Sequence, residues 1–321
     1  MRVGVLTSGG DSPAMNAAIR AITRVGIHRD CEVFGIYGGF RGILDERIHE
    51  LNSRSVSRIL HRGGTFLTTG RSEEFKTAAG MKKAHEILTR RGFDALIAIG
   101  GDGTMRGLSE FGQLWDGWLI GLPGTIDNDL SGTDYTIGFD TAVNNALEAL
   151  DKIRDTAQAF QRIFLVEVMG RHAGFIAFHV GFATGASAIL MPETETSIDE
   201  LAEKVIRARE KAKSSVLVVV AEGDELGNAH RIGSMLSERI GEKCRVSVLG
   251  YIQRGGNPTH FDRILATRLG AYAIECLLNG QHGGMVGEID GNLLMTPFED
   301  TWKKKKPIDK WMLGLLDELS G

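Results

Sequence analysis

One pattern recurs along this chain and limits the folds open to it. A short run of β-branched or apolar residues leads into a polar loop that carries glycine, and a stretch with helical spacing follows. The apolar runs lie at residues 3–6, 33–36, 95–99, 163–168, 216–220 and 246–249. Continuous apolar strands that alternate with helices are typical of parallel sheets covered by helices on both faces. The sequence therefore predicts an α/β fold.

Chain length predicts more than one hydrophobic core. The 321 residues exceed the usual size of a single domain, so we expect two domains. No proline- or serine-rich linker separates them. We expect the first boundary near Gly138, where a polar turn gives way to the apolar helical stripe that includes Val143 and Leu147.

Composition excludes several classes of protein. A net charge of −4 gives no bulk attraction to nucleic acid or to an anionic membrane. No stretch approaches the ~18 apolar residues of a membrane-spanning helix, and the apolar run at the N-terminus is too short for a signal peptide. Cys31, Cys244 and Cys276 lie far apart without C-x-x-C spacing, which favours a reducing compartment. We expect a cytoplasmic protein with no nucleic-acid or membrane partner.

Two carboxylates stand close together in a turn after an apolar run. Residues 123–129 read Pro-Gly-Thr-Ile-Asp-Asn-Asp, and we name this segment the carboxylate turn. Ligands of open α/β sheets bind at the carboxyl ends of strands, where Asp127 and Asp129 would offer a proton acceptor and a cation ligand. The alternative is a surface turn, because Asp and Asn are also favoured in turns for local reasons. The turn alone does not decide between these two interpretations.

Glycine-rich loops predict a phosphate-bearing ligand. Gly100–Thr104 and Thr7–Asp11 each follow a strand, and glycines there expose backbone N–H groups beside the start of a helix. Asp102 is placed to reach a Mg²⁺ ion held by phosphates. The alternative is a tight turn that needs glycine for its geometry alone. The chain has no G-x-x-x-x-G-K-[ST] segment, and no G-x-G-x-x-G follows its first strand.

Arginines near strand ends add to the phosphate prediction, since the guanidinium group matches phosphate geometry and stays charged. They are Arg71, Arg162, Arg171, Arg245 and Arg254. The run Lys303–Lys306 is a further candidate phosphate patch, but we expect these four lysines to be exposed, as short charge runs usually are.

Four motifs together resemble the bacterial ATP-dependent 6-phosphofructokinase family. They are Gly100–Gly103, Pro123–Asp129, Val166–Arg171 and Leu249–Gly256, in the family's order over nearly the whole chain. The resemblance implies transfer of the ATP γ-phosphoryl group to the 1-hydroxyl of fructose 6-phosphate, in glycolysis. It implies two three-layer α/β/α domains with mostly parallel sheets and an active site in the cleft between them. The implied ATP-binding domain is 1–138 plus 252–300, and the sugar-phosphate domain is 139–251 plus 301–321.

The resemblance also implies roles for single residues. Asp127 would accept the proton of the sugar hydroxyl, while Asp102 and Asp129 would serve Mg²⁺. The other implied catalytic residues are Arg71, Thr125 and Arg171. The implied ATP site is Gly10, Phe40, Arg71, Ser72, Asp102, Gly103, Thr104 and Gly107. The implied sugar-phosphate site is Thr125, Asp127, Asp129, Arg162, Met169, Gly170, Arg171, Glu222, Arg245, Tyr251 and Arg254.

Assembly and donor choice follow from the same resemblance. Arg162 and Arg245 would reach the 6-phosphate in a neighbouring subunit's site, and the family is usually a homotetramer. Pyrophosphate-using relatives typically carry an acidic residue at the position of Gly103 and a lysine at that of Gly124. Both are glycine here, which favours ATP. A pyrophosphate-dependent enzyme, a non-catalytic regulatory paralogue and a kinase for another sugar phosphate, such as tagatose 6-phosphate, remain as alternatives.

Some positions depart from the family pattern. Tyr251 stands where a histidine usually contacts the sugar phosphate, and Phe40 where an adenine-contacting tyrosine is common. An effector site for ADP or phosphoenolpyruvate is implied at Arg20, Arg24, Arg154, Lys211 and Lys213. However, Ser187 replaces a glutamate that in the family helps to hold the effector's Mg²⁺, so we expect effector control to be altered or absent.

Overall fold

The computed structural model describes residues 1–195, 197–210 and 215–320. The chain forms two compact units, and each draws on separate parts of the sequence. Unit 1 comprises Met1–Thr141 and Arg254–Lys306, and unit 2 comprises Ala142–Gln253 and Pro307–Gly321. In the described part of the chain, no helix has the length and apolar character needed to cross a membrane.

Unit 1 is built on a seven-stranded sheet with the strand order β11-β10-β5-β4-β1-β2-β3. The strands are β1 (Arg2–Thr7), β2 (Glu32–Ile36), β3 (Ile48–Glu50), β4 (Ala95–Gly100), β5 (Trp118–Pro123), β10 (Gly284–Ile289) and β11 (Asn292–Pro297). The pairs β2–β3 and β10–β11 are antiparallel, and all other pairs are parallel.

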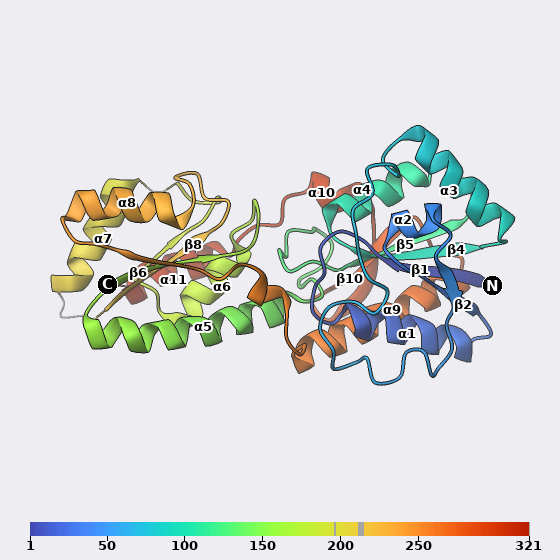
Figure 1. Cartoon of the computed structure of the whole chain (residues 1–321), viewed down its shortest axis with the longest axis horizontal. Coiled ribbons are helices and arrows are strands. Elements are labelled where there is room, and N and C mark those ends of the chain that lie inside the picture. Colours follow the sequence, from blue (N-terminus) through green and yellow to red (C-terminus); the bar gives the residue numbers. More distant parts are fainter. Residues whose placement is uncertain (196, 211–214, 321) are drawn as a thin grey trace. The chain divides into compact units, whose positions relative to one another are not determined.

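Helices cover both faces of this sheet (Figure 1). The helices of unit 1 are α1 (Met15–His28), α2 (Phe40–Leu44), α3 (Ala78–Arg90), α4 (Asp102–Phe111), α9 (His260–Leu278) and α10 (Asp300–Lys303). Successive strand residues alternate between two cores: Val5 and Ile97 belong to the core under α1 and α9, and Leu6 and Leu96 to the core under α2, α3 and α4. This two-sided burial explains why the strands read as continuous apolar runs.

Unit 2 contains a smaller parallel sheet, which within the described residues has the order β7-β8-β6-β9. Its strands are β6 (Ile163–Val168), β7 (Ala188–Leu190), β8 (Val216–Ala221) and β9 (Arg245–Val248). Its helices are α5 (Phe139–Phe160, whose first residues belong to unit 1), α6 (Phe175–Thr184), α7 (Ile198–Glu210), α8 (Ala229–Ile240) and α11 (Lys310–Ser320). The 3-10 helix η1 (Gly250–Arg254) follows β9 and ends in unit 1.

The prediction of an α/β protein with two mostly parallel sheets is confirmed.

The strand order of unit 1 indicates where a ligand would bind. The chain runs outward from β1 to β2 on one side, and β4 and β5 lie on the other side of β1. The connection after β1 therefore runs toward β2, and the connection after β4 runs the other way, toward β5. Such a switch point is where open α/β sheets bind ligands.

Candidate active site

The loops after β1 and β4 lie side by side at the carboxyl edge of the sheet in unit 1. The N–H of Ser8 donates to the backbone oxygen of Ile99 at 2.9 Å, and the buried Thr104 donates its hydroxyl to the Ser8 carbonyl at 3.3 Å. α4 begins at Asp102, directly after the glycines. The two glycine loops and the positive end of α4 thus lie together, an arrangement suited to an anion.

A third loop and a distant arginine complete this region. The hydroxyl of Thr69 donates to the Gly9 carbonyl at 3.0 Å, which places exposed Arg71 near the first glycine loop. Arg254 donates from Nη1 to the Asp11 carbonyl at 2.7 Å. A Cβ on Gly10 would lie 2.6 Å from that same Nη1, so Gly10 allows Arg254 to lie over the loop.

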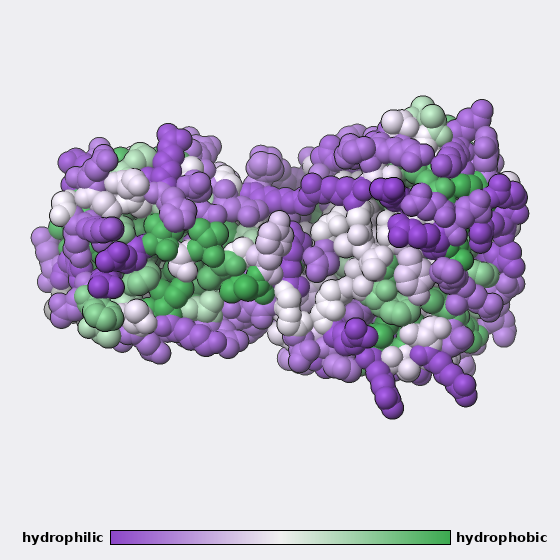
Figure 2. Space-filling model, in the orientation of Figure 1, coloured by the Kyte–Doolittle hydropathy of each residue, from purple (hydrophilic) through white to green (hydrophobic). Residues whose placement is uncertain are grey.

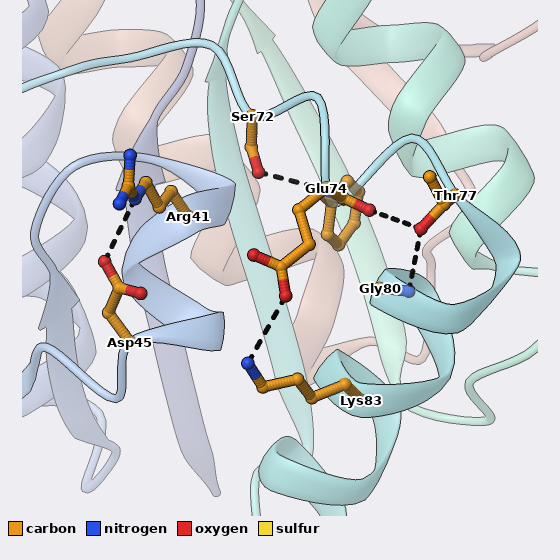
Figure 3. Close-up of polar contacts among 8 residues, drawn as sticks. Arg41, Asp45, Ser72, Glu74, Thr77, Gly80 and Lys83 are labelled. Atoms are coloured by element: carbon orange, nitrogen blue, oxygen red, sulfur yellow. Dashed lines mark hydrogen bonds and ion pairs between the residues drawn. The ribbon is translucent and has the colours of Figure 1, made fainter.

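The segment after Arg71 turns tightly into α3 (Figure 3). Ser72 Oγ accepts from the N–H of Phe75 at 3.1 Å, and Thr77 caps the helix by accepting from Gly80 at 3.0 Å. Ser72 therefore has a structural task in addition to its predicted place at the ATP site.

Phe40 and Gly107 are brought together on the other side of the glycine loops. A Cβ on Gly107 would lie 3.6 Å from the Phe40 ring. Phe40 is 5% exposed and stacks on Phe75, with ring centroids 4.1 Å apart. Phe75 thus covers one face of the Phe40 ring, and little of the side chain is left exposed for a ligand.

The carboxylate turn follows β5 at the same edge of the sheet. β4 and β5 pair in register from Ala95↔Trp118 to Gly100↔Pro123, so Asp102 and the turn leave adjacent strand ends. Asp127 is 3% exposed, and its N–H donates to Thr125 Oγ1 at 3.2 Å. Asp129 is half-buried. The interpretation of this segment as an exposed surface turn is therefore wrong.

Lys306 also contacts the carboxylate turn, which the sequence did not indicate. Its Nζ donates to Asn128 Oδ1 at 3.0 Å and to the Asp134 backbone oxygen. Burial lowers the pKa of Lys306 to about 8, while the carboxylates of Asp134 and Asp129 act in the opposite direction. The prediction that the whole lysine run is exposed is right for Lys303–Lys305 and wrong for Lys306.

Asp262 braces the segment after the turn. Its two carboxylate oxygens accept from the N–H of Gly138 at 2.9 Å and from the N–H of Thr141 at 2.8 Å, and the Thr141 hydroxyl also donates to it. Burial raises the pKa of Asp262 to about 6, and the hydrogen bonds from Thr141 and Gly138 act against that shift. No sequence motif marked this residue, because its partners lie more than 100 residues away.

The predicted metal-binding residues supply few ligands. Within the described residues, no group of three or more His, Cys, Asp or Glu side chains could hold a metal ion by itself. Asp102 Oδ1 pairs with Arg106 Nε at 2.9 Å, one helical turn further along α4. Two carboxylates at adjacent strand ends suit a Mg²⁺ ion that takes its other ligands from phosphates and water.

The two glycines that concern the choice of donor have different surroundings. A Cβ on Gly103 would meet nothing within 4 Å. A Cβ on Gly124 would lie 2.7 Å from Ile99 Cγ2 and 3.0 Å from Met15 Cε. Gly124 therefore has a packing reason to be glycine, whereas Gly103 borders open space that a ligand can use.

In unit 2, the predicted sugar-phosphate residues gather after β6 and β8. The N–H of Arg171 donates to Glu222 Oε1 at 2.7 Å, and the N–H of Met169 donates to Gln253 Oε1 at 2.9 Å. Gly170 adopts φ +146°, and a Cβ there would collide with the Ala173 backbone oxygen. The structure thus joins Met169, Arg171 and Glu222 in one loop cluster, while Tyr251 in η1 is 82% exposed.

Arg162 and Arg245 lie elsewhere in unit 2. Arg162 precedes β6, and Arg245 begins β9 and pairs with Phe164. They line a cavity of about 800 Å³ together with Lys243 and Glu238, so that three cationic side chains face it beside one carboxylate. Met169 follows the other end of β6, roughly 20 Å away at the rise of a β-strand. Within one chain, these arginines do not belong to the Met169 loop cluster.

The predicted effector residues are only partly described. Arg20 and Arg24 lie on α1 in unit 1, and Arg154 lies on α5 in unit 2, where it donates to the Thr184 backbone oxygen. Ser187 is 7% exposed, so it offers little to a ligand. Lys211 and Lys213 fall outside the described residues. The effector site stays a prediction.

The chain belongs to the phosphofructokinase family, whose sequence profile matches residues 2–277. It is 49% identical over 320 residues to the ATP-dependent 6-phosphofructokinase of Bacillus pumilus, covering 99% of each chain. It is 49% identical over 323 residues to ATP-dependent 6-phosphofructokinase 1 of Thermus thermophilus, again covering 99% of each. The resemblance carried by the four motifs is thereby confirmed.

Solved structures agree in fold. Phosphofructokinase from Saccharomyces cerevisiae superposes with a TM-score of 0.90 at 34% identity, covering 99% of this chain and 47% of the yeast chain. A pyrophosphate-dependent phosphofructokinase from Marinobacter aquaeolei superposes with a TM-score of 0.83 at 23% identity, covering 96% of this chain and 85% of that one. At this identity the similarity supports the fold and nothing further.

Proposed function

We propose that this chain transfers the γ-phosphoryl group of ATP to the 1-hydroxyl of fructose 6-phosphate, giving fructose 1,6-bisphosphate and ADP. The observation that carries the proposal is its full-length similarity to curated ATP-dependent 6-phosphofructokinases. The chain is accordingly a phosphotransferase with an alcohol acceptor. Its three cysteines are free and buried, which fits a reducing compartment, and we place the reaction in the cytoplasm.

In this proposal unit 1 binds ATP. The adjoining loops that carry Gly10, Gly103 and Thr104 supply backbone N–H groups to the phosphates, and Phe40 borders the base. Arg71 is exposed beside these loops and supplies a guanidinium charge to the transferring group. Asp102 and Asp129 would hold Mg²⁺, which neutralises phosphate charge when bound.

Asp127 is the proposed proton acceptor. Its burial limits competition from water, and the bond from its own N–H to Thr125 helps to fix the turn. The Asp127 carboxylate takes the proton of the sugar 1-hydroxyl as that oxygen bonds to the γ-phosphorus, and the bond from phosphorus to the β-γ bridging oxygen breaks. The electron pair of that bond leaves with ADP. Because the step depends on position and charge, Arg171 and Arg71 would stabilise it electrostatically.

Unit 2 is the proposed sugar-phosphate unit. Met169, Arg171 and Glu222 offer a charged and hydrogen-bonding cluster for sugar hydroxyls, with Gly170 leaving the backbone open. Tyr251 replaces a histidine of the family and can donate one hydrogen bond but carries no positive charge.

We further propose that each complete site takes Arg162 and Arg245 from a second copy of this chain. They lie at the opposite end of β6 from Met169, so they cannot contact the same phosphate as the Met169 cluster of their own chain. Figure 2 shows hydrophobic surface on unit 2 in the region of α6. Separately, Trp311 of α11 is 73% exposed. Apolar patches of this kind mark association surfaces. The family expectation of a homotetramer fits this arrangement.

The experiment that tests the function is a donor and acceptor panel. Purified protein with Mg²⁺ is assayed with fructose 6-phosphate or tagatose 6-phosphate as acceptor, and with ATP or pyrophosphate as donor. We expect turnover with ATP and fructose 6-phosphate. Product formed only with pyrophosphate, or only from the other sugar phosphate, contradicts the assignment, as does ATP binding without any transfer.

A further inference from the structure

The fourth lysine of the run Lys303–Lys306 differs from the other three. Lys303 pairs with Glu299, Lys304 pairs with Asp300 at 3.0 Å, and Lys305 is exposed. These are ordinary surface positions. Lys306 is instead half-buried, with its ammonium group donating to Asn128 and to the Asp134 backbone oxygen. Because withdrawing a charge from water is costly, this position needs such hydrogen bonds and nearby opposite charge.

Asn128 connects Lys306 to both carboxylates of the turn. It is 2% exposed and has φ +54°, a left-handed conformation that asparagine adopts more readily than most other non-glycine residues. Its Oδ1 also accepts from the N–H of Thr136 at 2.9 Å, and its Nδ2 donates to the Asp134 backbone oxygen at 3.3 Å. The side chain is thus held at both ends.

The backbone carries this restraint to the neighbouring residues. Asn128 shares one rigid peptide plane with Asp127 and the next with Asp129. Its φ and ψ therefore determine the direction in which both aspartates leave the turn.

We propose that Lys306 is a positioning residue for phosphoryl transfer: by holding Asn128 and the Asp134 carbonyl, it fixes the direction of the Asp127 carboxylate. This inference rests on the proposed function, because it affects turnover only if Asp127 accepts the proton. A misplacement of about 1 Å at a reacting group can cost on the order of 100-fold in rate.

The test compares three full-length variants. Lys306→Met removes the charge and the donors at similar length, Lys306→Arg keeps both, and Lys305→Met is the matched control one residue away. We expect K306M to lower kcat roughly 10- to 100-fold while KM for fructose 6-phosphate changes by less than about threefold. We expect K306R to keep most of the parent's kcat, and K305M to have the same kcat and KM as the parent.

A double-mutant cycle separates positioning from a general loss of folding. If Lys306 acts through Asp127, K306M lowers kcat little further when Asp127→Ser is already present. Thermal unfolding of each variant fixes an assay temperature at which all are folded. A kcat of K306M equal to that of the parent overturns the inference. So does a double variant in which K306M lowers kcat as much as it does in the parent, or a K306R variant whose kcat is as low as that of K306M. Parent-like turnover of D127S alone instead overturns the proton-acceptor assignment, and with it this inference.

Discussion

The two α/β units place their candidate functional residues differently on their sheets. In unit 1, the loops that hold Gly10, Asp102 and Asp127 all leave the carboxyl ends of adjacent parallel strands. In unit 2, Met169 and Glu222 follow β6 and β8, whereas Arg162 precedes β6 and Arg245 begins β9. Unit 1 therefore uses one edge of its sheet, and unit 2 uses both.

The two arrangements favour different kinds of site: one that a single chain can form, and one that needs residues of a second chain. Residues at one sheet edge can meet a common ligand in a single chain, as hydrogen bonds between neighbouring loops of unit 1 indicate. Residues at opposite ends of a strand cannot do so. The comparison leads us to expect that changes in unit 1 act within one chain, and that changes at Arg162 or Arg245 act on a neighbouring chain.

The largest expected effect is at Asp127 in unit 1. Asp127→Ser removes the proposed proton acceptor, and general-base catalysis typically contributes about 10²- to 10⁴-fold to rate. We expect kcat to fall by roughly 1,000-fold with KM for fructose 6-phosphate near the parent value, measured by steady-state kinetics. A variant that turns over like the parent would falsify the assignment.

The second prediction concerns Asp262 in unit 1 and the pH dependence of the free energy of unfolding. A pKa raised from 3.8 to about 6 on folding means that its stabilising contribution is full below about pH 4 and is lost as pH rises through about 6. This shift corresponds to about 3 kcal/mol. Asp262→Asn removes that dependence, so the stability advantage of the parent over D262N should shrink as pH rises from about 4 to 6.5.

Denaturant unfolding of both proteins across this pH range measures the effect. D262N should be the less stable of the two at the acid end, because the amide NH₂ group accepts no hydrogen bond, whereas both oxygens of the protonated carboxyl group keep some acceptor capacity toward Gly138 and Thr141. A stability difference that is constant with pH would argue against the raised pKa.

Arg245 tests the unit 2 side of the comparison. Arg245→Ser should raise KM for fructose 6-phosphate roughly 10- to 100-fold, as expected when one partner of a charge pair is lost. Mixed assemblies of D127S and R245S chains should regain low-KM activity, because a site with intact Asp127 can take Arg245 from the other chain. If mixing restores nothing although the two chains assemble together, then the arginine serves its own chain.

The smallest expected effect compares two glycines of unit 1. Gly124→Ala places a Cβ against Ile99 and Met15 and should reduce the free energy of unfolding by about 1–3 kcal/mol. Gly103→Ala meets open space and should stay within about 0.5 kcal/mol of the parent, as exposed substitutions usually do. Denaturant midpoints measure both values, and equal losses would show that the two positions do not differ in packing.

Much of the architecture was readable from the sequence. Apolar runs such as 95–99 and 216–220 became buried strands, because strands covered on both faces must be apolar throughout. The glycine loops and the carboxylate turn could be located because they directly follow those strands. The positions of Arg162 before β6 and Arg171 after it were likewise visible as sequence order.

What the sequence alone determined is therefore local: which segments form strands, where their loops fall and which reactive groups those loops carry. The tertiary structure decided the long-range contacts. Arg254 lies on the Asp11 loop across 243 positions, and Lys306 reaches Asn128 across 178. The lysine run has no period or motif that separates its last member from the other three. Only the packing of the chain after α10 against the carboxylate turn makes Lys306 half-buried and leaves Lys303–Lys305 exposed to water.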